Sequence, residues 1–283
     1  MNVLKYLQLH KITENSLFNL KRGKFNYLPK HFPKTWKTVL DEIEERLVVT
    51  AAKDNKNKKH FIFFHGGAYV CEAEFIHTLF AKRLINTHDI RVSYIDYPLA
   101  PESNALNTVE VSFKVYLKLI KKYSNDEIYI MGDSAGGGLA LVLLQKLRDN
   151  NLPLPKLTLL ISPWVDLTMT NPAINTLKKV DLLLPEGGLR HSAKLYADKV
   201  PLTNPLVSPL FNNQDNLGNV FITVGSDELF YSDVLILLDE MNKTNTNARL
   251  SIGKGMFHDY LLIPLKESRK SLKELFDFVE ELQ

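Results

Sequence analysis

Short apolar runs alternate with longer amphipathic stretches through most of the chain. Continuous apolar runs of this length are typical of strands that are buried on both faces of a sheet. The strand-like runs are residues 46–52, 60–64, 90–95, 128–131, 157–161, 220–224 and 249–252. The helical stretches are residues 73–86, 104–122, 139–148, 232–243 and 266–282. This alternation predicts an α/β fold, in which helices cover both faces of a mostly parallel sheet.

Two segments break the alternation, and we expect them to lie outside the sheet. Residues 1–45 have an amphipathic helical pattern, interrupted by Gly23, Pro29 and Pro33. Residues 168–206 contain helical pieces and scattered prolines and glycines, but no strand-like run. The length of 283 residues suits one large α/β domain, 1–283, with residues 168–206 inserted as a lid.

The apolar run 128–131 leads into a Gly-x-Ser-x-Gly sequence from Gly132 to Gly136, centred on Ser134, and a helical stretch follows. This strand–turn–helix context is typical of a nucleophile elbow, in which a strained turn exposes the serine hydroxyl. The flanking glycines leave room where strand and helix approach closely. A phosphate-binding loop is the alternative, but no lysine follows at the helix start, as a P-loop requires.

A serine nucleophile needs a base to take its proton and an acid group to orient that base. In hydrolases built on this elbow, the chain order is serine, then Asp or Glu, then histidine. Six of the eight histidines precede Ser134, and His191 lies in the predicted lid. His258 follows the last predicted strand, so we predict that it is the general base.

The acid group should lie between Ser134 and His258, at the carboxyl end of a strand. Asp227 follows the strand-like run 220–224 by three residues. We therefore prefer Asp227 as the acid, with the adjacent Glu228 as the alternative.

Other acids in this interval fit the role less well. Asp166 also follows a strand, but Trp164 and the nearby prolines indicate a structural corner. Asp259 directly follows His258 in sequence, so we expect it to be too local to orient the imidazole easily. The remaining aspartates lie in predicted helices or loops.

The buried run 60–64 ends in two glycines, Gly66 and Gly67, which Ala68 follows. Glycines at this point let backbone amides point into a shared space, as an oxyanion hole requires; a plain strand exit is the alternative. We predict that Ser134 attacks an ester carbonyl and that the oxyanion accepts hydrogen bonds from this turn and from Ala135. This chemistry requires no metal or organic cofactor, and no Cys/His cluster has zinc-ligand spacing.

Composition narrows the range of partners. The 35 basic and 32 acidic residues give a net charge of +3, a small excess that does not indicate a nucleic-acid partner. The single cysteine, Cys71, allows no intrachain disulfide and fits a reducing compartment. The N-terminal residues lack the continuous apolar core of a signal peptide, and no run approaches the length of a membrane span. We expect a cytoplasmic protein that acts on a small-molecule ester, without membrane insertion; homo-oligomerisation stays open.

Six short segments follow one another in a recognisable order between about residues 60 and 260. They are His65–Ala68, Asp96–Glu102, Gly132–Gly137, Ser162–Trp164, Ser208–Leu210 and Gly225–Leu229. Together they resemble the hormone-sensitive-lipase branch of the α/β hydrolase family, of the carboxylesterase and acetyl esterase type. The resemblance implies an eight-stranded α/β hydrolase sheet and a helical cap built partly from residues 1–45. It also implies carboxylesterase activity on short-chain or medium-chain esters.

The resemblance also assigns roles to individual residues. Ser134, Asp227 and His258 match the triad positions, and the oxyanion positions are Gly66, Gly67, Ala68 and Ala135. Many members of the family have a third glycine where this chain has Ala68. The donor N–H survives, but we expect the added methyl group to narrow the acyl pocket or to limit bulky tertiary-alcohol esters.

Three other functions are compatible with parts of this pattern. An amidase, such as a formamide hydrolase, would use the same triad. A second alternative is a binding protein on this fold, such as the plant gibberellin receptors. Those receptors have lost the catalytic histidine, whereas His258 is present here. A membrane-surface lipase would need a larger apolar lid face than Leu182–Leu184 provides.

Overall fold

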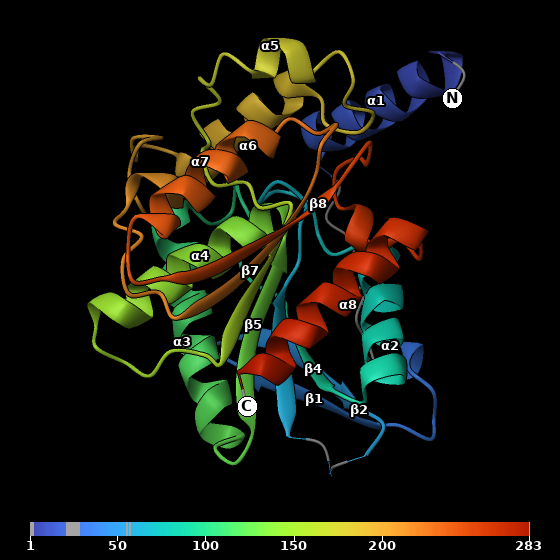
Figure 1. The fold of residues 1–283 in the computed structure, drawn as a ribbon, viewed down its shortest axis with the longest axis vertical. Helices are drawn as coiled ribbons and strands as arrows, with labels where there is room; N and C mark the ends of the chain where they lie inside the picture. Colours follow the sequence, from blue (N-terminus) through green and yellow to red (C-terminus); the bar gives the residue numbers. More distant parts are fainter. Residues whose placement is uncertain (1–2, 21–28, 55, 57, 283) are drawn as a thin grey trace.

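The computed structural model describes residues 3–20, 29–54, 56 and 58–282 and contains an eight-stranded sheet (Figure 1). The strand order is β1-β2-β4-β3-β5-β6-β7-β8. β2 runs antiparallel to β1 and β4, and the other neighbours are parallel. The prediction of a mostly parallel eight-stranded sheet is therefore confirmed. The strands are β1 (Lys37–Ile43), β2 (Arg46–Ala52), β3 (Lys59–Phe64), β4 (Arg91–Ile95), β5 (Glu127–Asp133), β6 (Leu157–Ile161), β7 (Asn219–Gly225) and β8 (Asn247–Gly253).

The helical prediction for residues 1–45 is wrong for residues 37–43, which form β1. Glu44 and Glu45 have left-handed backbone angles, with φ of 50° and 58°. Two such residues in succession make a tight hairpin turn, and the chain returns as β2, with Ile43 opposite Arg46. β1 is an edge strand that is largely exposed, so its polar residues imitate the pattern of an amphipathic helix.

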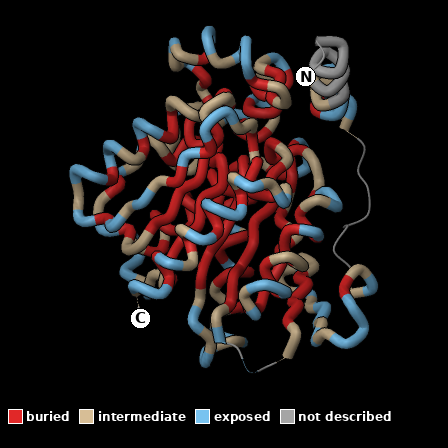
Figure 2. The backbone as a smooth tube through the Cα atoms, turned by 45° about the vertical axis from the view of Figure 1, so that its right-hand side comes forward, coloured by how far each residue is buried: buried red, intermediate tan, exposed pale blue. Residues whose placement is uncertain are grey.

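Helices cover both faces of the sheet, and successive residues of β3 show how the core divides. Ile62 and Phe64 pack on the face covered by α3 (Ala105–Lys122), α4 (Ser134–Asp149) and α7 (Tyr231–Asn242). Phe61 and Phe63 pack on the other face, which is covered by α2 (Phe75–His88) and α8 (Lys266–Glu281). The inner parallel strands, β3 to β7, are consequently buried on both faces (Figure 2), whereas the edge strand β8 is partly exposed.

Three further helices lie beyond the carboxyl ends of the parallel strands (Figure 1). They are α1 (Val3–Phe18), α5 (Ile174–Leu177) and α6 (Glu186–Ala197). α1 packs against α6, where the ring centroids of Phe18 and His191 lie 4.8 Å apart. The two segments predicted to lie outside the sheet, residues 1–45 and 168–206, thus place helices side by side beyond the strand ends. Among the described helices, none is long and apolar enough to cross a bilayer.

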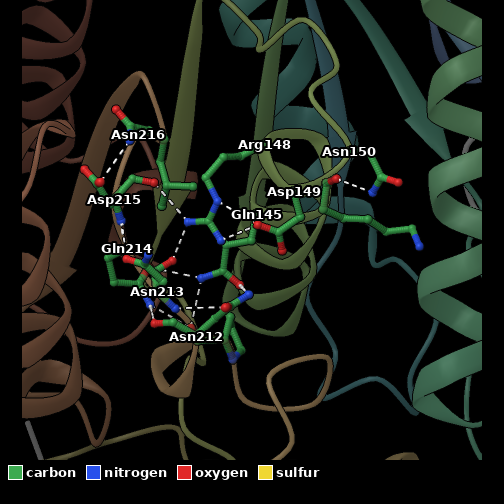
Figure 3. Close-up of polar contacts among 12 residues, drawn as sticks. Gln145, Arg148, Asp149, Asn150, Asn212, Asn213, Gln214, Asp215 and Asn216 are labelled. Atoms are coloured by element: carbon green, nitrogen blue, oxygen red, sulfur yellow. Dashed lines mark hydrogen bonds and ion pairs between the residues drawn. The ribbon is translucent and has the colours of Figure 1, made fainter.

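The carboxyl half of α4 is fixed to the loop that precedes β7 (Figure 3). Gln145 Nε2 donates to the carbonyl of Pro209 at 2.9 Å and to Gln214 Oε1 at 3.0 Å. Arg148 Nη1 donates to the carbonyls of Asn213 and Asp215, at 2.5 and 2.9 Å. These bonds hold one end of the helix whose other end carries Ser134.

Candidate active site

Ser134 lies at the junction of β5 and α4, the position expected of a nucleophile elbow. Its φ of 52° is in the left-handed region, which is strained for a residue with a side chain. A Cβ at Gly132 would collide with the Gly136 carbonyl, and one at Gly136 would collide with the Phe64 carbonyl. The two glycines therefore allow the close contact between strands and helix that this turn needs.

The turn after β3 lines the same cavity as Ser134. Gly67 has a φ of 118° and Ala68 a φ of 51°, so both residues depart from ordinary strand geometry. Within the described ranges, neither amide has a protein acceptor. Ala135 lies in the first turn of α4, where amides have no acceptor within the helix. Gly66 also lines the cavity beside Ser134.

Two buried rings hold this turn in shape. His65 and Tyr97 stack with their ring centroids 4.5 Å apart, and the Tyr97 hydroxyl donates to the His65 carbonyl at 2.7 Å. Burial lowers the pKa of His65 to about 4, so the ring is neutral near pH 7. Its Nδ1 lies 2.6 Å from the Gly66 carbonyl, to which the neutral ring donates. Two of the six short segments described above, His65–Ala68 and Asp96–Glu102, thus meet at this turn.

The imidazole of His258 is held by Glu228, not by Asp227. His258 Nδ1 lies 3.1 Å from Glu228 Oε1, whereas Asp227 Oδ1 accepts a hydrogen bond from the Ser226 hydroxyl. The other oxygen of Glu228 accepts bonds from the Ser162 hydroxyl at 2.8 Å and from the Gly225 amide at 2.9 Å. The preference for Asp227 is therefore corrected: the structure brings the alternative, Glu228, to the imidazole.

The physical reason lies in the direction of the turn after β7. The Asp227 amide donates to the Met256 carbonyl at 3.0 Å, which fixes the backbone there and leaves the Asp227 side chain partly exposed. The next side chain, Glu228, is fully buried. Its additional methylene group reaches the ring, and three donors satisfy its carboxylate.

A second carboxylate contacts the other nitrogen of the same ring. Asp259 Oδ2 lies 3.1 Å from His258 Nε2. Burial lowers the pKa of His258, but the charges of Asp259 and Glu228 outweigh it and raise this pKa well above its ordinary value. Burial raises the pKa of Asp259 to about 7, against the opposing effect of His258. Asp259 was expected to be too local to orient the ring easily, and Glu228 is the residue that holds Nδ1. Asp259 still contacts Nε2, because its left-handed backbone, with φ of 56°, turns the side chain back.

Sequence reasoning missed a second histidine–carboxylate pair, beneath the nucleophile. His77 Nε2 lies 3.1 Å from Asp133 Oδ2, and both side chains are buried. Burial lowers the pKa of His77, but Asp133 outweighs that effect and raises it to about 9. The ring is therefore charged at neutral pH. The available signal was Glu74-x-x-His77 at a helix start, where Nδ1–H of the charged ring donates to the Glu74 carbonyl at 3.1 Å.

Asp181 is a further buried acid that the sequence pattern placed only in a loop. Its side chain accepts hydrogen bonds from the amides of Leu183, Leu184 and Leu229, at 2.7–2.8 Å. Because Leu229 follows Glu228 directly, Asp181 ties the segment before α6 to the loop that holds the acid.

A cavity of about 350 Å³ is lined by Ser134, His258, Asp259 and the pair His77 and Asp133. Its floor includes Ser134, His258 and the turn from Gly66 to Ala68. Its apolar walls come from α1 and the 168–206 segment, through Leu17, Leu183, Leu184 and Leu189. Across the residues that the structure describes, no group of three or more His, Cys, Asp or Glu side chains could hold a metal ion.

A second Ser-His-Asp set occurs at the opposite end of the strands. His60 Nε2 lies 2.7 Å from Ser93 Oγ, and His60 Nδ1 lies 3.3 Å from Asp126 Oδ2, which Arg91 also contacts. His60 and Ser93 are fully buried, so no substrate reaches the hydroxyl. Cavity access, and not residue type, distinguishes Ser134 from Ser93.

Comparisons with known proteins agree with this architecture. A family model described as the α/β hydrolase fold matches residues 61–262. An esterase of Acinetobacter venetianus is 29% identical over 222 residues, 77% of this chain and 73% of that protein. An acetyl-hydrolase of Streptomyces hygroscopicus is 31% identical over 198 residues, 70% of this chain and 66% of that protein.

Solved structures give the same result over the whole chain. A hormone-sensitive lipase from a metagenome library superposes with a TM-score of 0.82 at 25% identity, covering 100% of this chain and 98% of that one. An esterase/lipase from an uncultured bacterium superposes with a TM-score of 0.81 at 25% identity, covering 98% of each chain. The chain belongs to the α/β hydrolase family, in its hormone-sensitive-lipase-like branch.

Proposed function

We propose that this protein is a serine carboxylesterase that hydrolyses short- to medium-chain esters through an acyl-enzyme. The observation that carries the proposal is Ser134, strained at an elbow on the floor of a cavity that His258 also lines. Relatives named esterase and acetyl-hydrolase support the same reaction class. A cavity of about 350 Å³ suits an ester of modest size.

The proposed reaction follows from the groups around the serine. Ser134 Oγ attacks the ester carbonyl carbon while Nε2 of neutral His258 takes the hydroxyl proton. Glu228 holds Nδ1–H and stabilises the imidazolium that forms. The developing oxyanion accepts hydrogen bonds from the amides of Gly67, Ala68 and Ala135; loss of one such donor typically costs about 3 kcal/mol of barrier.

Collapse of the tetrahedral intermediate breaks the bond to the leaving alcohol, which takes the proton from His258. Water then attacks the acyl-enzyme, again with His258 as the base, and the acid is released from Ser134. In this proposal α1 and residues 168–206 act as the cap, because they supply the apolar walls around the reacting carbonyl.

Hydrolysis of p-nitrophenyl acetate, butyrate, octanoate and palmitate tests the proposal, with the matching p-nitroanilides run in parallel. We expect turnover of the shorter esters, weak turnover of the palmitate and little of the anilides, and loss of turnover in Ser134→Ala. Faster hydrolysis of the anilides would favour an amidase. Turnover that persists in Ser134→Ala would reject the nucleophile.

A further inference from the structure

Asp259 occupies the side of the His258 ring that a serine nucleophile needs. Its Oδ2 lies 3.1 Å from Nε2, and its amide donates to the Ser162 hydroxyl at 3.1 Å. In the described part of the chain, no hydrogen bond joins the Ser134 hydroxyl to the imidazole, and Asp259 Oδ1 is buried without a hydrogen-bond partner. Asp259 therefore faces the cavity from the nucleophile's side of the ring.

When Asp259 is ionised, the two carboxylates specify one protonation state of the ring. A ring whose Nδ1 and Nε2 both donate to carboxylates is an imidazolium, which has no lone pair to accept a proton. General-base catalysis needs the neutral ring with Nε2 open toward the serine. The contact with Asp259 is thus compatible with a resting enzyme and incompatible with the attacking one.

We propose that Asp259 is a positioning residue that holds His258 in a protonated resting form, with Nε2–H bonded to its carboxylate. The inference rests on the proposed esterase function. For turnover, Nε2 loses its proton to solvent and the Asp259 carboxylate turns away from the ring. Neutral Nε2 then accepts the proton of Ser134. The acid limb of the pH–rate profile therefore reports how strongly Asp259 holds that proton.

Other charged groups face this pair and remain when Asp259 is changed. Glu228 lies on the far side of the ring, after β7. Asp133 at the end of β5 and His77 on α2 interact electrostatically with Asp259, and Asp181 interacts with His258. Substitution of Asp259 alone therefore removes one charge at Nε2 and leaves the rest of the field in place.

Asp259→Asn isolates the charge. Asparagine has nearly the same size as aspartate and tolerates the left-handed backbone of this position. It also keeps the hydrogen bond from the backbone amide to the Ser162 hydroxyl. Asp227→Asn is the matched control, because it removes one carboxylate from the neighbouring loop without touching the ring. If Asp259→Asn perturbs folding, Asp259→Gly suits the same backbone angle and repeats the test.

The direct readout is the NMR titration of the His258 ring, assigned by its loss in His258→Gln. We expect Asp259→Asn to lower the titration midpoint by about one to three pH units, the usual effect of one close opposite charge, while Asp227→Asn leaves it in place. An unchanged midpoint in Asp259→Asn overturns the proposal, whatever the activity. So does an equal shift in both variants.

The second readout is kcat/KM for p-nitrophenyl acetate against pH, which reports the free enzyme. The acid limb should move to lower pH by the same interval, so kcat/KM at pH 6 should rise about tenfold or more. A shifted midpoint with an unshifted acid limb overturns the role of Asp259 in the reaction. If the wild type does not hydrolyse esters but Asp259→Asn still lowers the titration midpoint of His258, the esterase function is rejected. The inference that Asp259 holds the protonated ring is then retained.

Discussion

Glu228 Oε1 lies 3.1 Å from His258 Nδ1, and the partly exposed Asp227 next to it makes no such contact. We predict that Glu228→Gln lowers kcat by roughly 10²–10⁴-fold, because a neutral amide stabilises the wrong tautomer and no longer stabilises the imidazolium. Asp227→Asn should leave kcat near that of the wild type. Steady-state kinetics of the two variants decide the assignment, and a larger loss in Asp227→Asn would reverse it.

Ala68 combines a left-handed backbone with a methyl group at the cavity. Replacement by glycine relieves backbone strain of about 1 kcal/mol, but the more flexible unfolded chain offsets about the same amount. Stability should therefore change little. We predict that Ala68→Gly raises the rate ratio of tert-butyl to n-butyl esters. The same ratio in both proteins would show that the methyl group does not restrict the pocket.

The His77–Asp133 pair should make stability depend on pH. The pKa of His77 is raised to about 9, above the unfolded value near 6.5, so the pair stabilises fully below pH 6.5. This stabilisation is lost as the pH rises through 9. His77→Gln should therefore cost about 3 kcal/mol at pH 6 and clearly less at pH 9.5.

Urea unfolding of the wild type and His77→Gln at both pH values checks this prediction. A His31→Gln control removes a histidine that lies outside this pair. A cost of His77→Gln that is equal at pH 6 and pH 9.5 would mean that the ring is not charged in the folded protein.

Arg148 should stabilise the fold without taking part in the chemistry. Arg148→Met removes two donors to the carbonyls of Asn213 and Asp215. We expect a loss of about 1–2 kcal/mol of unfolding free energy with little change in KM. Lys146→Met on the same helix removes a partly exposed ion pair with Glu110 and a contact of Nζ with the Phe113 ring, and should cost about 1 kcal/mol or less. Equal costs would contradict a specific anchoring role for Arg148.

Much of the fold could be predicted because its signals are local. Strands that are buried on both faces read as continuous apolar runs, and six of the eight strands, β2 to β7, carry this mark. The edge strand β8 is shown instead by a short alternation of apolar and polar residues. β1 lacks the continuous run, because it is an exposed edge strand closed by a hairpin without glycine. The elbow at Ser134 and the turn at Gly66–Ala68 were also visible, since both depend on residues that are adjacent in sequence.

The remaining parts of the site depend on tertiary contacts. The choice between Asp227 and Glu228 depends on which of these two adjacent side chains points inward. The hydrogen bond from the Asp227 amide to the Met256 carbonyl, which lies far away in the sequence, fixes this. His77 meets Asp133 across 56 positions of sequence. Asp259 contacts the adjacent His258 ring only because its backbone is left-handed. No pattern of apolar and polar residues predicts that conformation.

The identity of Ser134 as the reacting group is the central claim, and covalent labelling tests it most directly. Folded protein is treated with a fluorophosphonate, and the site is mapped by mass spectrometry of the peptides, with Ser134→Ala as the control. We predict one adduct per chain, on Ser134, that forms in step with loss of ester hydrolysis and is absent from Ser134→Ala. No adduct on the folded wild type, or an adduct on another residue with hydrolysis retained in Ser134→Ala, would contradict the account.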